Sequence, residues 1–109
     1  MFKTLFSYCS GMSLKLDRIR NGIDNCNQVI IDAIDDRMDY VIEVAEYKDE
    51  NDMRIVDEER EEEVKQDFEK KFEERGMPGE RGREFAELII ATAIDLEEEK
   101  LDKKIERRN

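Results

Sequence analysis

The sequence predicts an all-α fold, in which a long N-terminal helix and two further helices form a small helical bundle or a coiled-coil-like oligomer. Three observations support this prediction. The 109 residues include one proline and five glycines, which leaves few places for the tight turns of sandwiches and barrels. Charged residues make up 45% of the chain, well above the share usual in globular domains. Apolar residues recur every three or four positions through the first half. The length suits one small domain.

The first half of the chain is expected to form one long helix. Its apolar residues alternate in steps of three and four, which gives a heptad seam of about six heptads. Ser13 is a suitable N-cap, so the helix is placed at 13–47, with an arm or short helix at 1–12 before it. Gly11 and Gly22 lower the helix propensity, and a break is possible at either one.

The second half of this helix has two distinct faces. The acidic face consists of Asp32, Asp35, Asp36, Asp39, Glu43 and Glu46. The opposite face is apolar and wider than a two-stranded contact needs, which indicates packing against more than one neighbour. Arg37 lies within this apolar face. A guanidinium there needs a carboxylate from another helix, or must extend along its stem to solvent.

Two more helices follow. Residues 53–75 are strongly charged with one narrow apolar edge, which is typical of a solvated helix. Residues 76–83 contain three of the five glycines and the single proline, and predict a loop. Residues 84–107 then form the C-terminal helix. Its segment 85–94, FAELIIATAI, is apolar nearly all round, so we expect it to be buried on every side.

The apolar faces predict self-association. A chain this small cannot cover such a wide apolar surface alone, so we expect an oligomer, most simply a homodimer. The residues assigned to this interface or to the core are Leu16, Ile19, Ile23, Ile30, Ile34, Val41, Phe85 and Ile89.

The charge balance restricts the partners. Nineteen basic and 30 acidic side chains give a net charge of −11, which disfavours direct binding to nucleic acid or to an anionic membrane. It favours a basic or nucleic-acid-binding protein as partner. We therefore hypothesise a non-enzymatic regulator or inhibitor that presents its acidic face to such a partner. Small acidic antagonists encoded by viruses and mobile elements are analogous in type. The alternative is a coiled-coil scaffold or assembly chaperone.

Several kinds of catalytic and metal-binding site require residues that the chain lacks. The chain has no histidine, which removes Ser-His-Asp triads, histidine acid–base catalysis and di-iron Glu-x-x-His sites. We therefore expect no enzyme, no cofactor and no metal. Two cysteines are too few for a disulfide framework, and no apolar stretch could span a membrane, so a cytoplasmic protein is expected. Arg81 and Arg83 form a locally basic spot, which either contacts an anion or acidic partner or pairs with the chain's own carboxylates.

A third interpretation comes from two short acidic strings. Glu58–Glu62 has the form EExxE, and Glu99–Asp102 has the form ExxD. These strings resemble the metal-binding helices of the all-α nucleotide pyrophosphohydrolases. The resemblance implies a helical, Mg²⁺-dependent enzyme acting on nucleotides.

Overall fold

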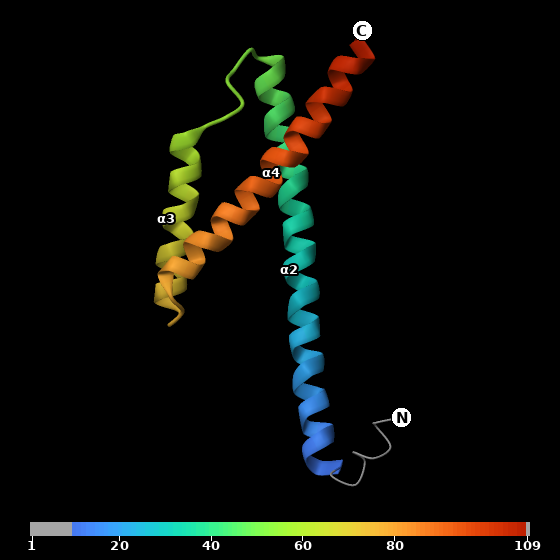
Figure 1. Ribbon diagram of the computed structural model, residues 1–109, viewed down its shortest axis with the longest axis vertical. Coiled ribbons are helices and arrows are strands. Elements are labelled where there is room, and N and C mark those ends of the chain that lie inside the picture. Colours follow the sequence, from blue (N-terminus) through green and yellow to red (C-terminus); the bar gives the residue numbers. More distant parts are fainter. Residues whose placement is uncertain (1–9, 109) are drawn as a thin grey trace. The chain divides into compact units, whose positions relative to one another are not determined.

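The computed structural model describes residues 10–108, with side chains from residue 13 to residue 100 (Figure 1). The described chain consists of three helices, α2 (Ser10–Glu50), α3 (Glu58–Glu74) and α4 (Gly79–Arg108). No strand occurs among these residues, and the predicted all-α fold is confirmed. None of the described helices combines the length and apolar character required to cross a membrane.

The chain divides into two compact units, Met1–Asp35 and Asp36–Asn109. The described part of the first unit is the N-terminal portion of α2. This helix passes through Gly11 and Gly22 without a break, and a Cβ atom at Gly22 would meet no neighbouring atom within 4 Å. Most of the predicted arm 1–12 lies outside the described residues. Four predicted interface residues of this portion are about half exposed: Leu16 (45%), Ile19 (52%), Ile23 (55%) and Ile30 (55%). Another, Ile34, is half-buried.

The second unit contains the end of α2, which extends three residues beyond the predicted Tyr47. Polar groups after the helix satisfy its last carbonyl groups. The Asn51 side-chain amide donates to the Tyr47 carbonyl oxygen at 2.8 Å, and the Met53 N–H donates to the Lys48 carbonyl oxygen at 2.8 Å. These bonds close the helix without glycine.

Helix α3 begins later than the predicted residue 53, because the capping side chain is Asp57. Its Oδ1 accepts a hydrogen bond from the Arg60 N–H at 3.0 Å. At the other end Gly76 has φ 77°, and the Met77 N–H donates to the Phe72 carbonyl oxygen at 2.9 Å. This is the Schellman arrangement, which requires a left-handed residue directly after the helix end.

The predicted loop 76–83 is too long, since α4 begins at Gly79. The Pro78 carbonyl oxygen accepts hydrogen bonds from the N–H groups of Arg81 and Gly82, at 3.1 and 3.3 Å. Proline cannot donate a backbone hydrogen bond, but its carbonyl starts the helix ladder as well as any other. The turn between α3 and α4 therefore spans only residues 75–78.

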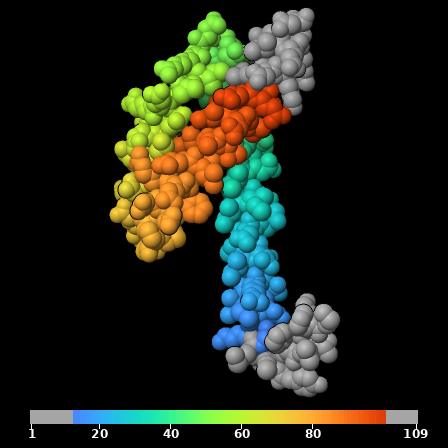
Figure 2. All heavy atoms as spheres, viewed as in Figure 1, coloured from blue at the N-terminus to red at the C-terminus, as the bar shows by residue number. Residues whose placement is uncertain are grey.

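Helices α3 and α4 form a hairpin whose side chains are in contact (Figure 2). They approach closely at the buried Gly82, where a Cβ atom would lie 2.6 Å from the Phe68 carbonyl oxygen. The rings of Phe72 and Phe85 pack nearby with centroids 5.6 Å apart. A side chain at position 82 would have to push the helices apart, because the nearest obstacle is backbone.

The core of the second unit is small. Its buried apolar residues are Met38, Ala45, Ala86, Ile90 and Ala93, and the predicted core residues Val41 and Ile89 are half-buried. The expectation that residues 85–94 are buried on every side is wrong, since Leu88 is 67% and Phe85 54% exposed. The cause is geometric, because only α3 and the end of α2 share this unit with α4, and they cover part of its circumference.

Candidate active site

The acidic face of α2 contributes no side chain to the pocket of the second unit. All six of its carboxylates are exposed, and none of them lines the pocket of the second unit: Asp32, Asp35, Asp36, Asp39, Glu43 and Glu46. Asp32 accepts a hydrogen bond from the Gln28 side chain at 3.0 Å. This arrangement is that of a solvated helix face.

The basic spot pairs with the chain's own carboxylates. Arg81 binds Glu84 one turn along α4 at 2.6 Å. The Arg83 Nη2 atom donates hydrogen bonds to both carboxylate oxygens of Glu62 on α3, at 2.7 and 2.8 Å, and this ion pair links α3 to α4. Hydrogen bonding to Glu62 raises the pKa of Arg83, while the same bond lowers the pKa of Glu62. Both arginines therefore have partners within the protein.

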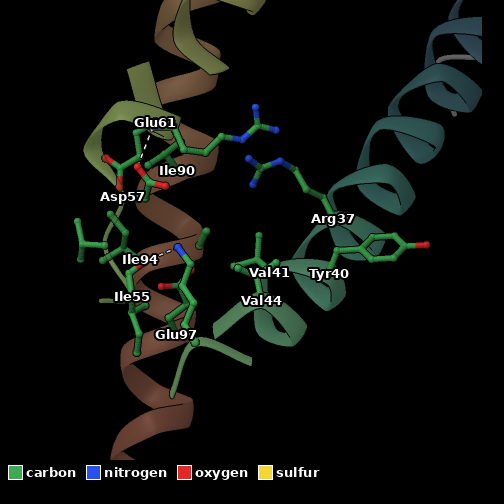
Figure 3. A pocket seen from close by; sticks show the side chains of 14 residues that line it. Arg37, Tyr40, Val41, Val44, Ile55, Asp57, Glu61, Ile90, Ile94 and Glu97 are labelled. Atoms are coloured by element: carbon green, nitrogen blue, oxygen red, sulfur yellow. Dashed lines mark hydrogen bonds between the residues drawn. The ribbon is translucent and has the colours of Figure 1, made fainter. Parts of the chain in front are cut away.

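A pocket of about 270 Å³ lies within the second unit (Figure 3). Its walls come from the end of α2, the connection to α3, the start of α3 and the middle of α4. The apolar lining includes Val41, Val44, Ile90 and Ile94, whereas the labelled ring of Tyr40 points away from the pocket. The volume lies just below the range of about 300–1,000 Å³ that is typical of ligand sites, which suits a small molecule.

Arg37 is the most unusual group in this pocket. Its Nη1 atom is buried and has no hydrogen-bond partner. Burial lowers the pKa of Arg37, and the positive charge of Arg60 lowers this pKa further. Two guanidinium groups thus lie close enough to repel each other, and both line the pocket. A buried donor without a partner beside a like charge costs folding free energy, and such an arrangement indicates a binding site for an anionic ligand.

A second group of charges lines the pocket where α2 ends. The Lys48 Nζ atom donates a hydrogen bond to the Ile55 carbonyl oxygen at 3.2 Å. Glu97 of α4 is half-buried, and burial raises the pKa of its carboxyl group. The negative charges of Glu61 and Glu98 raise this pKa as well, whereas the positive charge of Lys48 opposes the rise. Glu97 is therefore easier to protonate than an ordinary glutamate, and its carboxyl group can act as a hydrogen-bond donor.

The start of α3 brings the remaining polar groups to the pocket. Asp57 uses one carboxylate oxygen to cap the helix, which fixes its side chain at the pocket wall. Arg60 and Glu61 follow within the first turn and line the same wall. The pocket thus contains three cationic and three carboxyl side chains around an apolar wall: Arg37, Lys48, Arg60, Asp57, Glu61 and Glu97.

A comparison with known protein families matches the region of the chain that contains this pocket. Residues 19–98 of the 109-residue chain match the family of type II chorismate mutases. The chain belongs to the type II chorismate mutase family. The matched range includes every residue that lines the pocket, and the family fold is all-α like the one described here. No curated protein and no solved structure matches the chain significantly.

This membership corrects the functional hypotheses drawn from the sequence. A non-enzymatic regulator, inhibitor, scaffold or assembly chaperone is wrong, and so is the expectation that the chain is not an enzyme, because the family indicates an enzyme. The nucleotide pyrophosphohydrolase interpretation fails as well. The Glu58–Glu62 string lies within residues 19–98, which match the type II chorismate mutase family instead. The side chains described for residues 13–100 include no group of three or more acidic or cysteine residues that could hold a metal.

One sequence signal pointed to the site. Arg37 interrupts an apolar face, for which the sequence predicts either a carboxylate partner from another helix or extension of the side chain to solvent. The structure instead leaves its Nη1 without a protein partner at a pocket. Lys48, Asp57 and Glu97 gave no comparable signal, since each lies among many other charged residues.

Proposed function

We propose that this protein catalyses the rearrangement of chorismate to prephenate in the pocket of its second unit. The observation that carries the proposal is the buried, unpartnered Nη1 of Arg37 beside the charge of Arg60, in a pocket within the region that matches the chorismate mutase family. Chorismate carries two carboxylates, and such a pair of guanidinium groups offers each carboxylate a planar, two-pronged donor.

All bond changes of this rearrangement take place within the chorismate molecule. The ether C–O bond breaks while a new C–C bond forms, and six electrons move in one concerted step. No proton, electron or group passes to another molecule. The protein therefore needs neither a nucleophile nor a general base. It must hold the flexible enolpyruvyl arm over the ring, which saves activation entropy, and it must stabilise the charge that develops on the ether oxygen.

The groups at the end of α2 and on α4 suit the second task. Lys48 supplies N–H donors, and Glu97 supplies an O–H donor when it is protonated, which its raised pKa favours. We assign both to the ether oxygen, because a C–O bond that breaks ahead of C–C formation makes this oxygen more negative in the transition state. Donors aimed at developing charge in a partly desolvated pocket accelerate the step.

The remaining lining residues bind the rest of the molecule. Asp57 and Glu61 are acceptors at the start of α3, and we assign them to the ring hydroxyl group. The apolar wall, with Val41 of α2 and Ile90 of α4 at its centre, covers the ring and displaces water. All three helices of the second unit thus contribute both charged and apolar or acceptor groups to the proposed site.

The test is a steady-state assay that follows the loss of the ultraviolet absorbance of chorismate. We expect saturable turnover by the wild-type protein and a large loss of kcat/KM in Arg37→Met and Lys48→Met. The matched control is Arg81→Met, which removes an exposed arginine outside the pocket and should leave turnover unchanged. A folded wild-type protein that does not exceed the uncatalysed rate would refute the proposal.

We further propose that the protein is a homodimer, supported by the apolar residues of the first unit that are exposed in a single chain. Ile19, Ile23 and Ile30 are each more than half exposed and lie on one heptad seam. A second copy offers the same seam in return, as a symmetric interface requires. We expect light scattering to give the mass of two chains for the wild type and of one chain for Ile23→Lys. A wild-type monomer at micromolar concentration would contradict this.

A further inference from the structure

Lys48 is held in place by the connection between α2 and α3. It lies in the last turn of α2, is half-buried and lines the pocket. Its Nζ atom donates to the carbonyl oxygen of Ile55, seven residues further along the chain, at 3.2 Å. Ile55 itself lies at the pocket wall (Figure 3). The side chain therefore reaches forward over the connection and is anchored to its backbone.

The same connection is fixed to Lys48 by a second bond. The Met53 N–H donates to the Lys48 carbonyl oxygen at 2.8 Å, and the Asp52 N–H donates to the Asp49 carbonyl oxygen at 3.4 Å. These two bonds have the Schellman pattern, in which the residue after the helix adopts a left-handed conformation. Asp52 occupies that position with φ 54°, a conformation more often taken by glycine.

We infer that the left-handed turn at Asp52 is a positioning element for Lys48, a role that rests on the proposed chorismate mutase activity. The turn places the Ile55 carbonyl opposite the ammonium group and so fixes one of its three donors. The other two donors remain for the substrate. Asp52 is not among the residues that line the pocket, so its proposed effect on the reaction is indirect.

A carbonyl oxygen suits this task better than a carboxylate. The pocket also contains the carboxyl groups of Asp57, Glu61 and Glu97, each of which attracts an ammonium group when it is ionised. A direct ion pair with one of them would neutralise the charge that the transition state needs. The neutral Ile55 carbonyl holds the ammonium group at a defined position and leaves its charge available.

The inference makes a specific kinetic prediction for the turn. A displacement of a catalytic group by about 1 Å can cost roughly 100-fold in rate. Valine strongly disfavours the left-handed region, so Asp52→Val should displace the Ile55 carbonyl and lower kcat by roughly 10- to 100-fold. KM should change much less, because Lys48 is assigned to charge that appears in the transition state. Asp52→Gly is the matched control, since glycine keeps the turn and should retain kcat within about twofold.

A double-mutant cycle separates positioning from a general structural effect. In a Lys48→Met background there is no ammonium group to position, so Asp52→Val should cause no further loss of kcat. Equal losses in both backgrounds would overturn the inference, as would an Asp52→Val variant with wild-type kcat. Circular dichroism of each variant reports whether the helices remain formed.

A second change tests the acceptor itself if Asp52→Val does not fold. Replacing Val56 by its α-hydroxy analogue turns the Ile55 carbonyl into an ester carbonyl, a weaker acceptor, without altering any side chain. We expect kcat to fall roughly 2- to 10-fold, and an unchanged kcat would refute the role of this carbonyl. Wild-type protein without mutase activity would instead refute the proposed function, so the two failures are distinguishable.

Discussion

Replacement of Arg37 by methionine should change activity and stability in opposite directions. Methionine keeps much of the apolar stem and removes the guanidinium group, whose Nη1 is buried without a partner in the free protein. A hydrogen bond to a charged group is worth about 1.5–3 kcal/mol, and about 1.4 kcal/mol corresponds to a tenfold change in rate. Loss of one such bond lowers kcat/KM roughly 10- to 150-fold, and loss of a bidentate pair lowers it further.

The free protein should gain stability from the same change. Arg37→Met removes an unsatisfied donor and the repulsion between this arginine and Arg60. The guanidinium group is only partly buried, so we reduce the usual penalty to about 1 kcal/mol or less. For a domain of this size, 1 kcal/mol corresponds to roughly 4–8 °C in Tm.

The assay pairs initial rates of chorismate consumption with thermal unfolding followed by circular dichroism. Arg81→Met is the control, and it should alter neither quantity appreciably because its ion pair is exposed. The reasoning is refuted if Arg37→Met keeps kcat/KM within about threefold of the wild type, or if its Tm falls together with its activity. The second result would mean that Arg37 supports the fold rather than the ligand.

Three further predictions concern pH, packing and helix propensity. Protonated Glu97 is the proposed donor, and its pKa is raised. We therefore expect kcat/KM to fall as the pH rises through that pKa, whereas Glu97→Gln should lose this descending limb of the pH–rate profile. The raised pKa also means that Glu97 contributes most to stability below its pKa in the unfolded state and loses that contribution as the pH rises through its pKa in the folded state. In urea titrations, the unfolding free energy of the wild type relative to Glu97→Gln should therefore decrease as the pH rises. Gly82→Ala should lower the unfolding free energy by about 1–3 kcal/mol, since its Cβ would meet the Phe68 backbone, and an unchanged value would refute the close approach of α3 and α4. Gly22→Ala should instead raise the unfolding free energy by about 0.5–1 kcal/mol in the same urea titration, and a decrease would show that this helix position is not open.

Helix class and order follow from local rules, which is why the sequence predicts them. The apolar period of the first half and the glycine–proline cluster near residue 78 indicate helices joined by a short turn. Helix ends depend on single capping bonds that the pattern does not reveal. The Asp57 cap shortens α3 by five residues relative to the prediction, and the bonds from Asn51 and Met53 lengthen α2.

The site could not be predicted in the same way. In a chain with 45% charged residues, Lys48 and Glu97 have no local feature that separates them from the others. They come together only because the end of α2, the start of α3 and the middle of α4 surround one pocket. The lack of histidine removes only those mechanisms that depend on this residue, whereas the proposed rearrangement needs only binding and electrostatic stabilisation. Arg37 was visible in the sequence, but its role follows only from its unpaired atom.

The most direct test is a crystal structure of the protein with a cyclic dicarboxylate that imitates the rearrangement transition state. We expect one carboxylate on the Nη1 atom of Arg37, and the ether oxygen within hydrogen-bond distance of Lys48 and Glu97. A ligand bound elsewhere, or one in this pocket that leaves Arg37 unpaired, would contradict the proposed active site.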